Sequence, residues 1–164
     1  MLLEDFNVAD RDDAIALLRP CVDVTRWCEH IVDCRPYASV EELAAAADAA
    51  DPFTSDEIAA ALAHHPRIGE RADGSGREAA MSRAEQSGVD PGDRAVQEAL
   101  AEGNLAYEQR FGRVFLIRAA GRDAREILSS LRERLRNDDA TEARVVAEQL
   151  REIALLRLKA TVTA

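Results

Sequence analysis

The chain has 164 residues, which suits one domain with a sizeable hydrophobic core. Its formal net charge of −10 opposes approach to nucleic acid and to anionic membranes, so we expect neither as a partner. The sequence has no apolar run of membrane-spanning length and no basic leader at its start, and it holds three cysteines. These features favour a cytoplasmic protein, and they leave room for a small anionic ligand held by a local arginine.

The first predicted helices follow from capping residues and apolar periodicity. Asp10 is placed to cap a helix that runs to about residue 18, where Pro20 closes it. The apolar spacing over residues 21–34 predicts a second helix, which stops before Pro36.

Two capping boxes predict the next pair of helices. Ser39 with Glu42 opens a helix that reaches about residue 50, and Thr54 with Glu57 opens another after an Asp-Pro break. We expect the second of these helices to extend to the two histidines at 64–65.

The cysteines indicate structural thiols. On a single helix over 21–34, Cys21 and Cys28 would share a face but lie too far apart to form a disulfide. A zinc site of Cys28, His30 and Cys34 is conceivable, but it matches no common ligand spacing. We therefore expect the thiols to be buried.

The middle of the chain predicts a loop and two helices. Residues 71–76 read as a loop, and a helix should follow over about 78–86. Pro91 is suited to the first position of the next helix, which Gly112 should end. One face of that helix carries a polar residue among apolar ones, in the order Leu100, Asn104, Tyr107 and Phe111.

The last third is again helical. Residues 114–117 are strand-like but too short and isolated to build a sheet. Amphipathic helices are predicted over 122–136 and from about 139 to 161. The fold class is therefore all-α: a single-domain helical bundle of about seven or eight helices over residues 1–164.

His65 is the first candidate for chemistry. A residue before proline is pushed toward extended backbone, so Pro66 should end the helix and present the imidazole at the mouth of a loop. An imidazole there can act as acid, base or ligand near neutral pH. On spacing alone, a structural role at the end of a helix is the simpler interpretation.

Polar residues at three further places strengthen the catalytic interpretation. Ser82, Glu85 and Gln86 share one helix face, which could be solvated or could contact a ligand. Asn104 lies on an apolar stripe, where it either binds a loop backbone or contributes to a site. Arg157 falls on or beside the buried stripe of the last helix, so it must pair with or bind an anion unless its head reaches solvent.

Two other classes of function stay open at this stage. A metal-dependent hydrolase could use His64 and His65 with a nearby acid, although adjacent imidazoles diverge and no His-x-x-x-His pair exists. A non-enzymatic helical binding module would instead show a large exposed apolar stripe without convergent polar groups.

The ordered motifs resemble those of the OHCU decarboxylases, which act on 2-oxo-4-hydroxy-4-carboxy-5-ureidoimidazoline between urate and allantoin. The similar segments are residues 65–70 (His-Pro-Arg-Ile-Gly-Glu), 82–86 (Ser-Arg-Ala-Glu-Gln), 104–112 (Asn-Leu-Ala-Tyr-Glu-Gln-Arg-Phe-Gly), 114–117, 121–122, 134–137, Glu142 and 157–158. The resemblance covers nearly the whole chain. It departs from many members at Arg67-Ile68 and at Arg113-Val114.

The resemblance implies an all-α carboxy-lyase that needs no cofactor and no metal and forms homodimers. It implies that His65 and Glu85 are catalytic, and that the following residues bind substrate: Pro66, Ser82, Gln86, Ile117, Ala119, Gly121 and Arg157. The expected ligand is the small ureidoimidazoline, and the expected product is (S)-allantoin. Coupling to the 5-hydroxyisourate hydrolase that makes this substrate is a further expectation.

Overall fold

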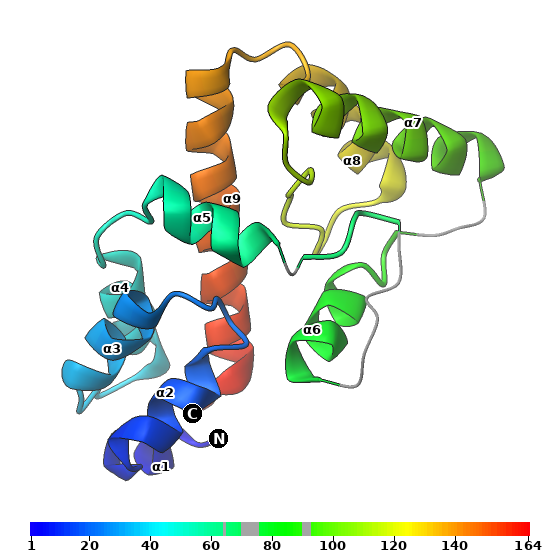
Figure 1. Cartoon of the computed structure of the whole chain (residues 1–164). Helices are drawn as coiled ribbons and strands as arrows, with labels where there is room; N and C mark the ends of the chain where they lie inside the picture. The colour runs from blue at the N-terminus through cyan, green and yellow to red at the C-terminus, as the bar shows by residue number, and fades with distance from the viewer. Residues whose placement is uncertain (64, 70–75, 90–92) are drawn as a thin grey trace. The chain divides into compact units, whose positions relative to one another are not determined.

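The computed structural model describes residues 1–63, 65–69, 76–89 and 93–164 of the chain. These residues contain nine α-helices and no strand (Figure 1). In chain order the helices are α1 (Leu3–Val8), α2 (Arg11–Leu18), α3 (Thr25–Asp33), α4 (Val40–Asp48), α5 (Ser55–Leu62), α6 (Arg77–Glu85), α7 (Arg94–Phe111), α8 (Ala124–Arg134) and α9 (Asp139–Thr161). The predicted all-α class is confirmed.

The chain divides into two compact units. The first comprises residues 1–57 and 151–164, and the second comprises residues 58–150. Helices α5 and α9 each contribute residues to both units. None of the described helices is both long enough and apolar enough to cross a membrane.

The predicted caps are present. The Asp10 carboxylate accepts a hydrogen bond from the Asp12 N–H at 2.9 Å, and the Ser39 hydroxyl accepts one from Glu42 N–H at 3.1 Å. In the second capping box, the Glu57 carboxylate accepts from Thr54 N–H at 2.8 Å. These bonds satisfy backbone donors that a helix start leaves unpaired, which is why residue type alone located them.

Several predicted boundaries are wrong, each for a local reason. The helix predicted over 21–34 begins only at Thr25. Val22 and Val24 are buried while Asp23 between them is exposed, which is the alternation of an extended segment rather than of a helix. Helix α1 was not predicted, because its six residues are too few to show a period.

Two other helix ends also differ from the prediction. Helix α5 ends at Leu62, before the histidines, and the His65 N–H bonds the Leu62 carbonyl at 3.1 Å. Helix α7 begins at Arg94 because the Asp93 carboxylate caps it, accepting from the N–H groups of the next turn. His64, Pro91 and the predicted loop residues 71–75 lie outside the described residues.

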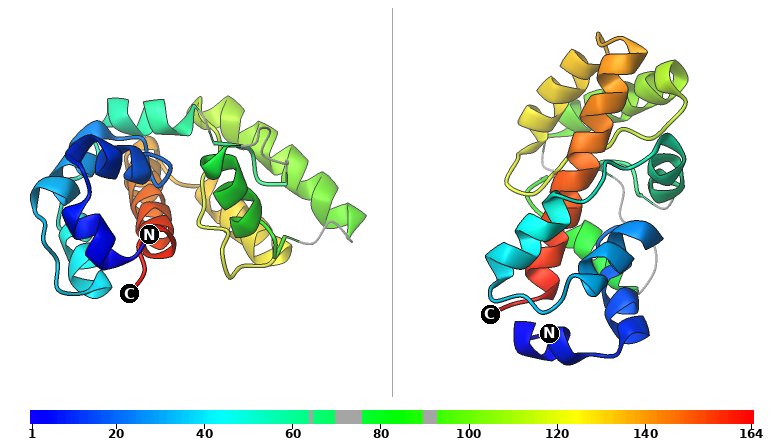
Figure 2. Two further views of the ribbon diagram at one scale, coloured as in Figure 1. Left: turned by 90° about the horizontal axis from the view of Figure 1, so that it is seen from below. Right: turned by 90° about the vertical axis from the view of Figure 1, so that its left-hand side faces the viewer.

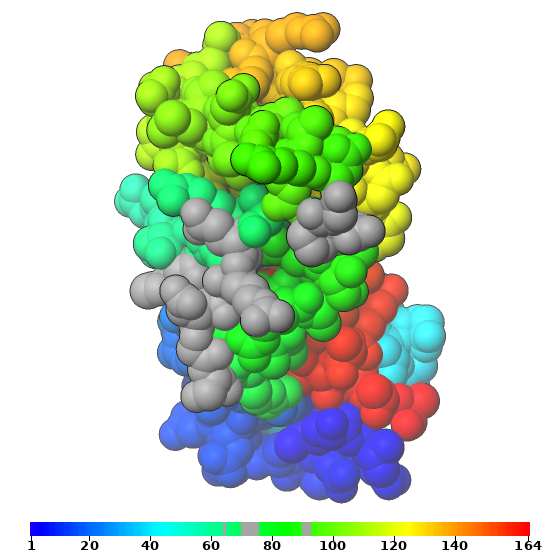
Figure 3. Space-filling model, turned by 90° about the vertical axis from the view of Figure 1, so that its right-hand side faces the viewer, coloured from blue at the N-terminus to red at the C-terminus, as the bar shows by residue number. Residues whose placement is uncertain are grey.

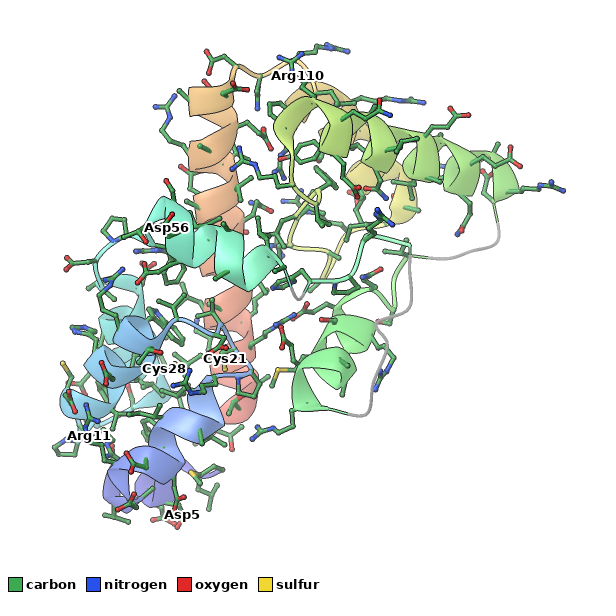
Figure 4. All side chains as sticks on the ribbon, in the orientation of Figure 1. Asp5, Arg11, Cys21, Cys28, Asp56 and Arg110 are labelled. Carbon is green, nitrogen blue, oxygen red and sulfur yellow. The ribbon has the colours of Figure 1, made fainter. Side chains whose placement is uncertain are left out.

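The core of the first unit surrounds Trp27. Its indole N–H donates to the Ala47 carbonyl at 3.1 Å, which joins α3 to α4. Cys21 and Cys28, both labelled in Figure 4, are buried in this unit, whereas Cys34 is exposed. The expectation of three buried thiols therefore holds for two, and Cys34 lies at the C-terminal cap of α3, where its side chain reaches solvent.

Thiol reactivity should separate the three cysteines. Burial raises the pKa of Cys28 to about 12, so its thiol stays protonated and unreactive at neutral pH. In the native protein we expect a disulfide reagent to modify Cys34 rapidly, and Cys21 and Cys28 only after denaturation. The Cys34→Ser variant should lose the rapid phase. Rapid native modification of two or three thiols would contradict the assigned burial.

The core of the second unit is built between α7 and α8, which lie side by side (Figure 2). A Cβ at Gly103 of α7 would lie only 2.5 Å from the Leu131 side chain of α8, so the absence of a side chain allows this close approach. The buried residues of this core are Ile68, Val89, Leu100, Tyr107, Phe115, Ile117, Ala119, Ile127, Leu128 and Leu131.

A buried ion pair joins three helices of this unit. The Glu142 carboxylate of α9 is fully buried and accepts two bonds from the Arg134 guanidinium of α8, at 2.6 and 2.8 Å. The Tyr107 hydroxyl of α7 donates to the same oxygen at 2.5 Å, and Asn137 donates to the other at 2.9 Å. Burial and the hydrogen bond to Glu142 raise the pKa of Tyr107 to about 12, so its hydroxyl stays protonated and remains a donor.

Removing the charge of Glu142 should destabilise the protein strongly. Glu142→Gln leaves the buried Arg134 without a counter-charge, and we expect the free energy of unfolding to fall by about 3–5 kcal/mol. The exposed Arg94–Glu98 pair of α7 provides a matched control, since Glu98→Gln should change stability by less than about 0.5 kcal/mol. Urea unfolding of both variants measures the difference. Equal midpoints for the two variants would contradict the buried role.

Candidate active site

The site is built around the loop that follows α5. His65 and Pro66 are half-buried, Arg67 is exposed, Ile68 is buried and Gly69 is exposed. Gly69 has a φ of +89°, a conformation that L side chains rarely adopt, so glycine permits the turn here. The loop thus presents its imidazole partly sheltered while Ile68 anchors it in the core.

Three consecutive residues of this loop are each held by a side chain from a helix. The Glu108 carboxylate of α7 binds the Arg67 guanidinium with two bonds, at 2.5 and 2.8 Å. Asn104, one turn earlier on α7, donates from Nδ2 to the Ile68 carbonyl at 3.0 Å. At the end of α6, Gln86 accepts from the Gly69 N–H at 3.0 Å. Arg67, Ile68 and Gly69 are therefore fixed by directional bonds.

Asn104 is only 5% exposed, and its Oδ1 atom has no hydrogen-bond partner among the described residues. A buried polar atom without a partner costs about 1–3 kcal/mol. Of the two roles that its place on an apolar stripe allowed, the described structure shows the first: Asn104 binds the backbone of the loop.

The Arg67–Glu108 pair is electrostatically favourable on the surface. The hydrogen bonds from Arg67 are the main cause that holds the pKa of Glu108 below its usual range. Because the pKa of Glu108 is lowered in the folded state, the ion pair stabilises the protein at pH values above the usual pKa of glutamate. This stabilisation is lost as the pH falls through the lowered pKa. The pair is therefore intact throughout the neutral range.

Helix α6 places the predicted ligand-binding face beside the loop. Ser82 is buried, while Glu85 and Gln86 are half-buried at the C-terminal end of the helix. Figure 3 shows α6 and the start of α7 at the surface, in bright green. The bond from Gly69 to Gln86 brings this end of α6 to the backbone that follows His65 and Pro66.

The segment that follows α7 packs in the same core cluster as the loop after α5. Ile117 and Ala119 are buried in the core cluster that also holds Ile68 of the loop. The Arg134 guanidinium donates to the Leu116 carbonyl at 2.6 Å, and Gln149 accepts from the Arg118 N–H at 2.9 Å. These bonds hold the backbone of residues 116–118 in place.

Gly121 ends this segment in an exposed turn, with a φ of +79°. The Arg122 N–H that follows it bonds the Ala119 carbonyl at 3.0 Å. The turn after α6 comes close, since a Cβ at Gly88 would lie 3.3 Å from the Arg122 carbonyl oxygen. The predicted residues of the second unit therefore occupy neighbouring backbone segments.

Arg157 belongs to the first unit. It is buried, and its Nη1 donates to the Pro20 carbonyl at 3.2 Å. The guanidinium therefore pairs with backbone within that unit, and its predicted contact with substrate stays a prediction.

The sequence predicted no role for Glu108, Arg134 or Gln149, although Glu108 and Arg134 lie in segments that resemble the family. These three residues hold the Arg67 side chain and the backbone at Leu116 and Arg118. Glu108 lies four residues after Asn104, so helical spacing alone could have placed it on the same face. Nothing in the local sequence signals the bonds from Arg134 to the Leu116 carbonyl and from the Arg118 N–H to Gln149, because backbone atoms distant in the chain take part in them.

The described part of the chain contains no set of side chains that could ligate a metal ion. No group of three or more His, Cys, Asp or Glu side chains there could hold a metal ion, and this includes Cys28, His30 and Cys34. His64, which the hydrolase alternative requires, lies outside the described residues.

Comparisons with known proteins show which family this chain is similar to. The sequence model of the family described as OHCU decarboxylase matches residues 7–159, spanning both units. The chain is 27% identical to the 2-oxo-4-hydroxy-4-carboxy-5-ureidoimidazoline decarboxylase of Haloferax volcanii, over 96% of this chain and 94% of that protein. It is 26% identical to a uric acid degradation bifunctional protein of a Bacillus species, over 97% of this chain and 32% of that protein.

Solved structures share the fold. An OHCU decarboxylase crystallised in the presence of (S)-allantoin superposes with a TM-score of 0.67 at 22% identity, covering 92% of this chain and 96% of that one. An (S)-allantoin synthase superposes with a TM-score of 0.72 at 18% identity, covering 99% of this chain and 54% of that one.

The fold and the family match together define an all-α enzyme of the carboxy-lyase class. The chain belongs to the OHCU decarboxylase family.

The Gly69 conformation yields a test of the loop. Gly69→Ala should lower both stability, by about 1–2 kcal/mol, and decarboxylase activity, because a side chain disfavours the positive φ. Gly76→Ala is the matched control, since Gly76 has a φ of −70° and no atom of the described residues would lie within 4 Å of an added Cβ. Thermal unfolding and steady-state rates measure both variants. Equal behaviour of the two variants would contradict the strained turn.

Proposed function

We propose that this chain converts 2-oxo-4-hydroxy-4-carboxy-5-ureidoimidazoline to (S)-allantoin in urate degradation, with His65 as general acid and base. Family membership and full-length similarity to a curated decarboxylase support the substrate. The observation that carries the assignment of the site is the bond between Gly69 and Gln86. It joins the predicted ligand-binding end of α6 to the loop that contains His65.

The chemistry requires one bond to break and one proton to be delivered. Loss of CO₂ breaks the bond between the ring carbon and its carboxylate, and the electron pair passes into the ring. The ring carbon that carries the ureido group then takes up a proton, and the face that receives it sets the configuration of allantoin. A histidine held at one side of the ring supplies this proton to one face, because imidazole can act as an acid and a base near neutral pH.

The neighbouring groups have complementary roles. Glu85, half-buried on α6, hydrogen-bonds the substrate and helps to orient His65. Pro66 packs against the ring, while Ser82, Gln86 and the backbone around Ile117, Ala119 and Gly121 bind the polar groups of the ring and the ureido arm. Arg157 balances the negative charge of the substrate.

The assembly and the pathway context complete the proposal. The chain acts as a homodimer in the cytoplasm, needs no cofactor, and works beside the 5-hydroxyisourate hydrolase that supplies its unstable substrate. The similarity of this chain to one third of a protein named for bifunctional uric acid degradation supports this pathway context.

Replacing His65 should remove the selective proton delivery. With substrate generated in situ from urate, His65→Ala should lower kcat by about 10²–10⁴-fold, because general acid–base catalysis contributes about this factor. Circular dichroism of the product follows the enantiomeric excess, since spontaneous decay gives racemic allantoin.

His30→Ala is the matched control, because His30 is exposed on α3 in the first unit. It should leave both the rate and the enantiomeric excess unchanged. A near-full rate for the His65→Ala variant would overturn the role of His65. Racemic product from the wild-type protein at a rate equal to spontaneous decay would overturn the reaction itself.

A further inference from the structure

We infer that Asn104 and Glu108 of α7 are positioning residues for the decarboxylation, because they hold the Ile68 backbone and the Arg67 side chain, which follow His65 and Pro66. This inference rests on the proposed role of His65. Neither residue is assigned a contact with the substrate. Each acts by fixing the loop that carries the imidazole.

The two residues lie one turn apart on the same face of α7 and bind successive residues of the loop. Asn104 donates to the Ile68 carbonyl at 3.0 Å, and Glu108 binds the Arg67 side chain at 2.5 and 2.8 Å. Together they fix the main chain at Ile68 and the side-chain direction at Arg67. Only Pro66, whose φ is restricted by its ring, separates these contacts from His65.

Ile68 packs in the core with Leu100 and Tyr107 of α7, and directional bonds add a further constraint where the loop borders a cavity beside α7. This cavity has a volume of about 250 Å³. It is lined by Arg67, Ile68, Gly69, Gln97, Leu100, Ala101, Asn104, Leu105 and Glu108. In a close-packed core, side-chain shape holds neighbouring segments in register, but a cavity provides no such contacts. Asn104 and Glu108 both line this cavity, and so do the loop residues that they bind.

The burial of Asn104 supports a specific role for its amide. The residue lies on a stripe with Leu100 and Tyr107, and its Oδ1 has no partner among the described residues. An apolar side chain would avoid the unpaired Oδ1 but would take the Asn104 donor away from the Ile68 carbonyl. The donor at Nδ2 is therefore the property that distinguishes asparagine here, and its acceptor is the carbonyl of Ile68.

The expected consequence is kinetic. Misplacing a catalytic group by about 1 Å can reduce a rate about 10²-fold even when the substituted residue is remote from the reacting atoms. Substrate binding through α6 and the 117–121 backbone remains in such a variant. Loss of the bonds should therefore lower kcat more than it raises KM, and should lower the enantiomeric excess of the product.

The test uses Asn104→Leu, which keeps the side-chain size and removes the donor, and Glu108→Gln, which keeps the shape and removes the charge. For Asn104→Leu we expect kcat to fall about 10–100-fold with KM changed less than about threefold. A smaller loss in the same direction is expected for Glu108→Gln, because its bond to Arg67 is exposed. Rates and enantiomeric excess are corrected for spontaneous decay and for the folded fraction.

Glu98→Gln on α7 is the control, since its exposed carboxylate pairs only with Arg94 four residues earlier among the described residues. It should match the wild type. A merely structural role would reduce the folded fraction and leave the corrected kcat and enantiomeric excess unchanged, which would overturn the inference. Wild-type values for Asn104→Leu would do the same. If the His65→Ala variant also remains fully active, the proposed role of His65 is wrong. If His65→Ala is inactive and Asn104→Leu is unaffected, only the positioning role of Asn104 is wrong.

Discussion

The second unit depends on the buried ion pair between Arg134 and Glu142. Burying two charges is unfavourable unless each is paired and hydrogen-bonded, and here both conditions are met. The carboxylate accepts from Arg134, Tyr107 and Asn137, while the guanidinium also reaches the Leu116 carbonyl and lies 4.7 Å from the centre of the Phe115 ring. One group of side chains thereby joins α7, α8, α9 and the extended segment that continues to the candidate site.

In the candidate site, side chains of helices also hold extended segments by hydrogen bonds, and these bonds are weaker and more exposed. Side chains from α7 and from the end of α6 hold the backbone of Ile68 and Gly69, and Arg134 and Gln149 hold the backbone of residues 116–118. Helices act here as rigid supports for two loop-like segments. An enzyme that must protonate one face of a planar ring benefits from such fixed geometry, because selectivity depends on where the acid stands.

The local features of the fold were predictable from the sequence. Capping residues at Asp10, Ser39 and Thr54 act over three or four positions, and the apolar period of α7 and α8 extends over several turns. The errors occurred where a few residues decided the outcome. The extended residues before Thr25 and the six-residue helix α1 are too short for periodicity, and packing determines their conformation.

For the candidate site, the sequence by itself determined the residue types and their order: a histidine before a proline, a polar face ending at Gln86, and a motif around Asn104. It could do so because a proline, a helical period and the motifs of a family are all local features of the sequence. Only the tertiary structure decided which groups meet. Glu108 lies 41 residues from Arg67, and Asn104 lies 36 from Ile68. Bonds over such separations depend on how the helices pack, and local sequence carries no information about that packing.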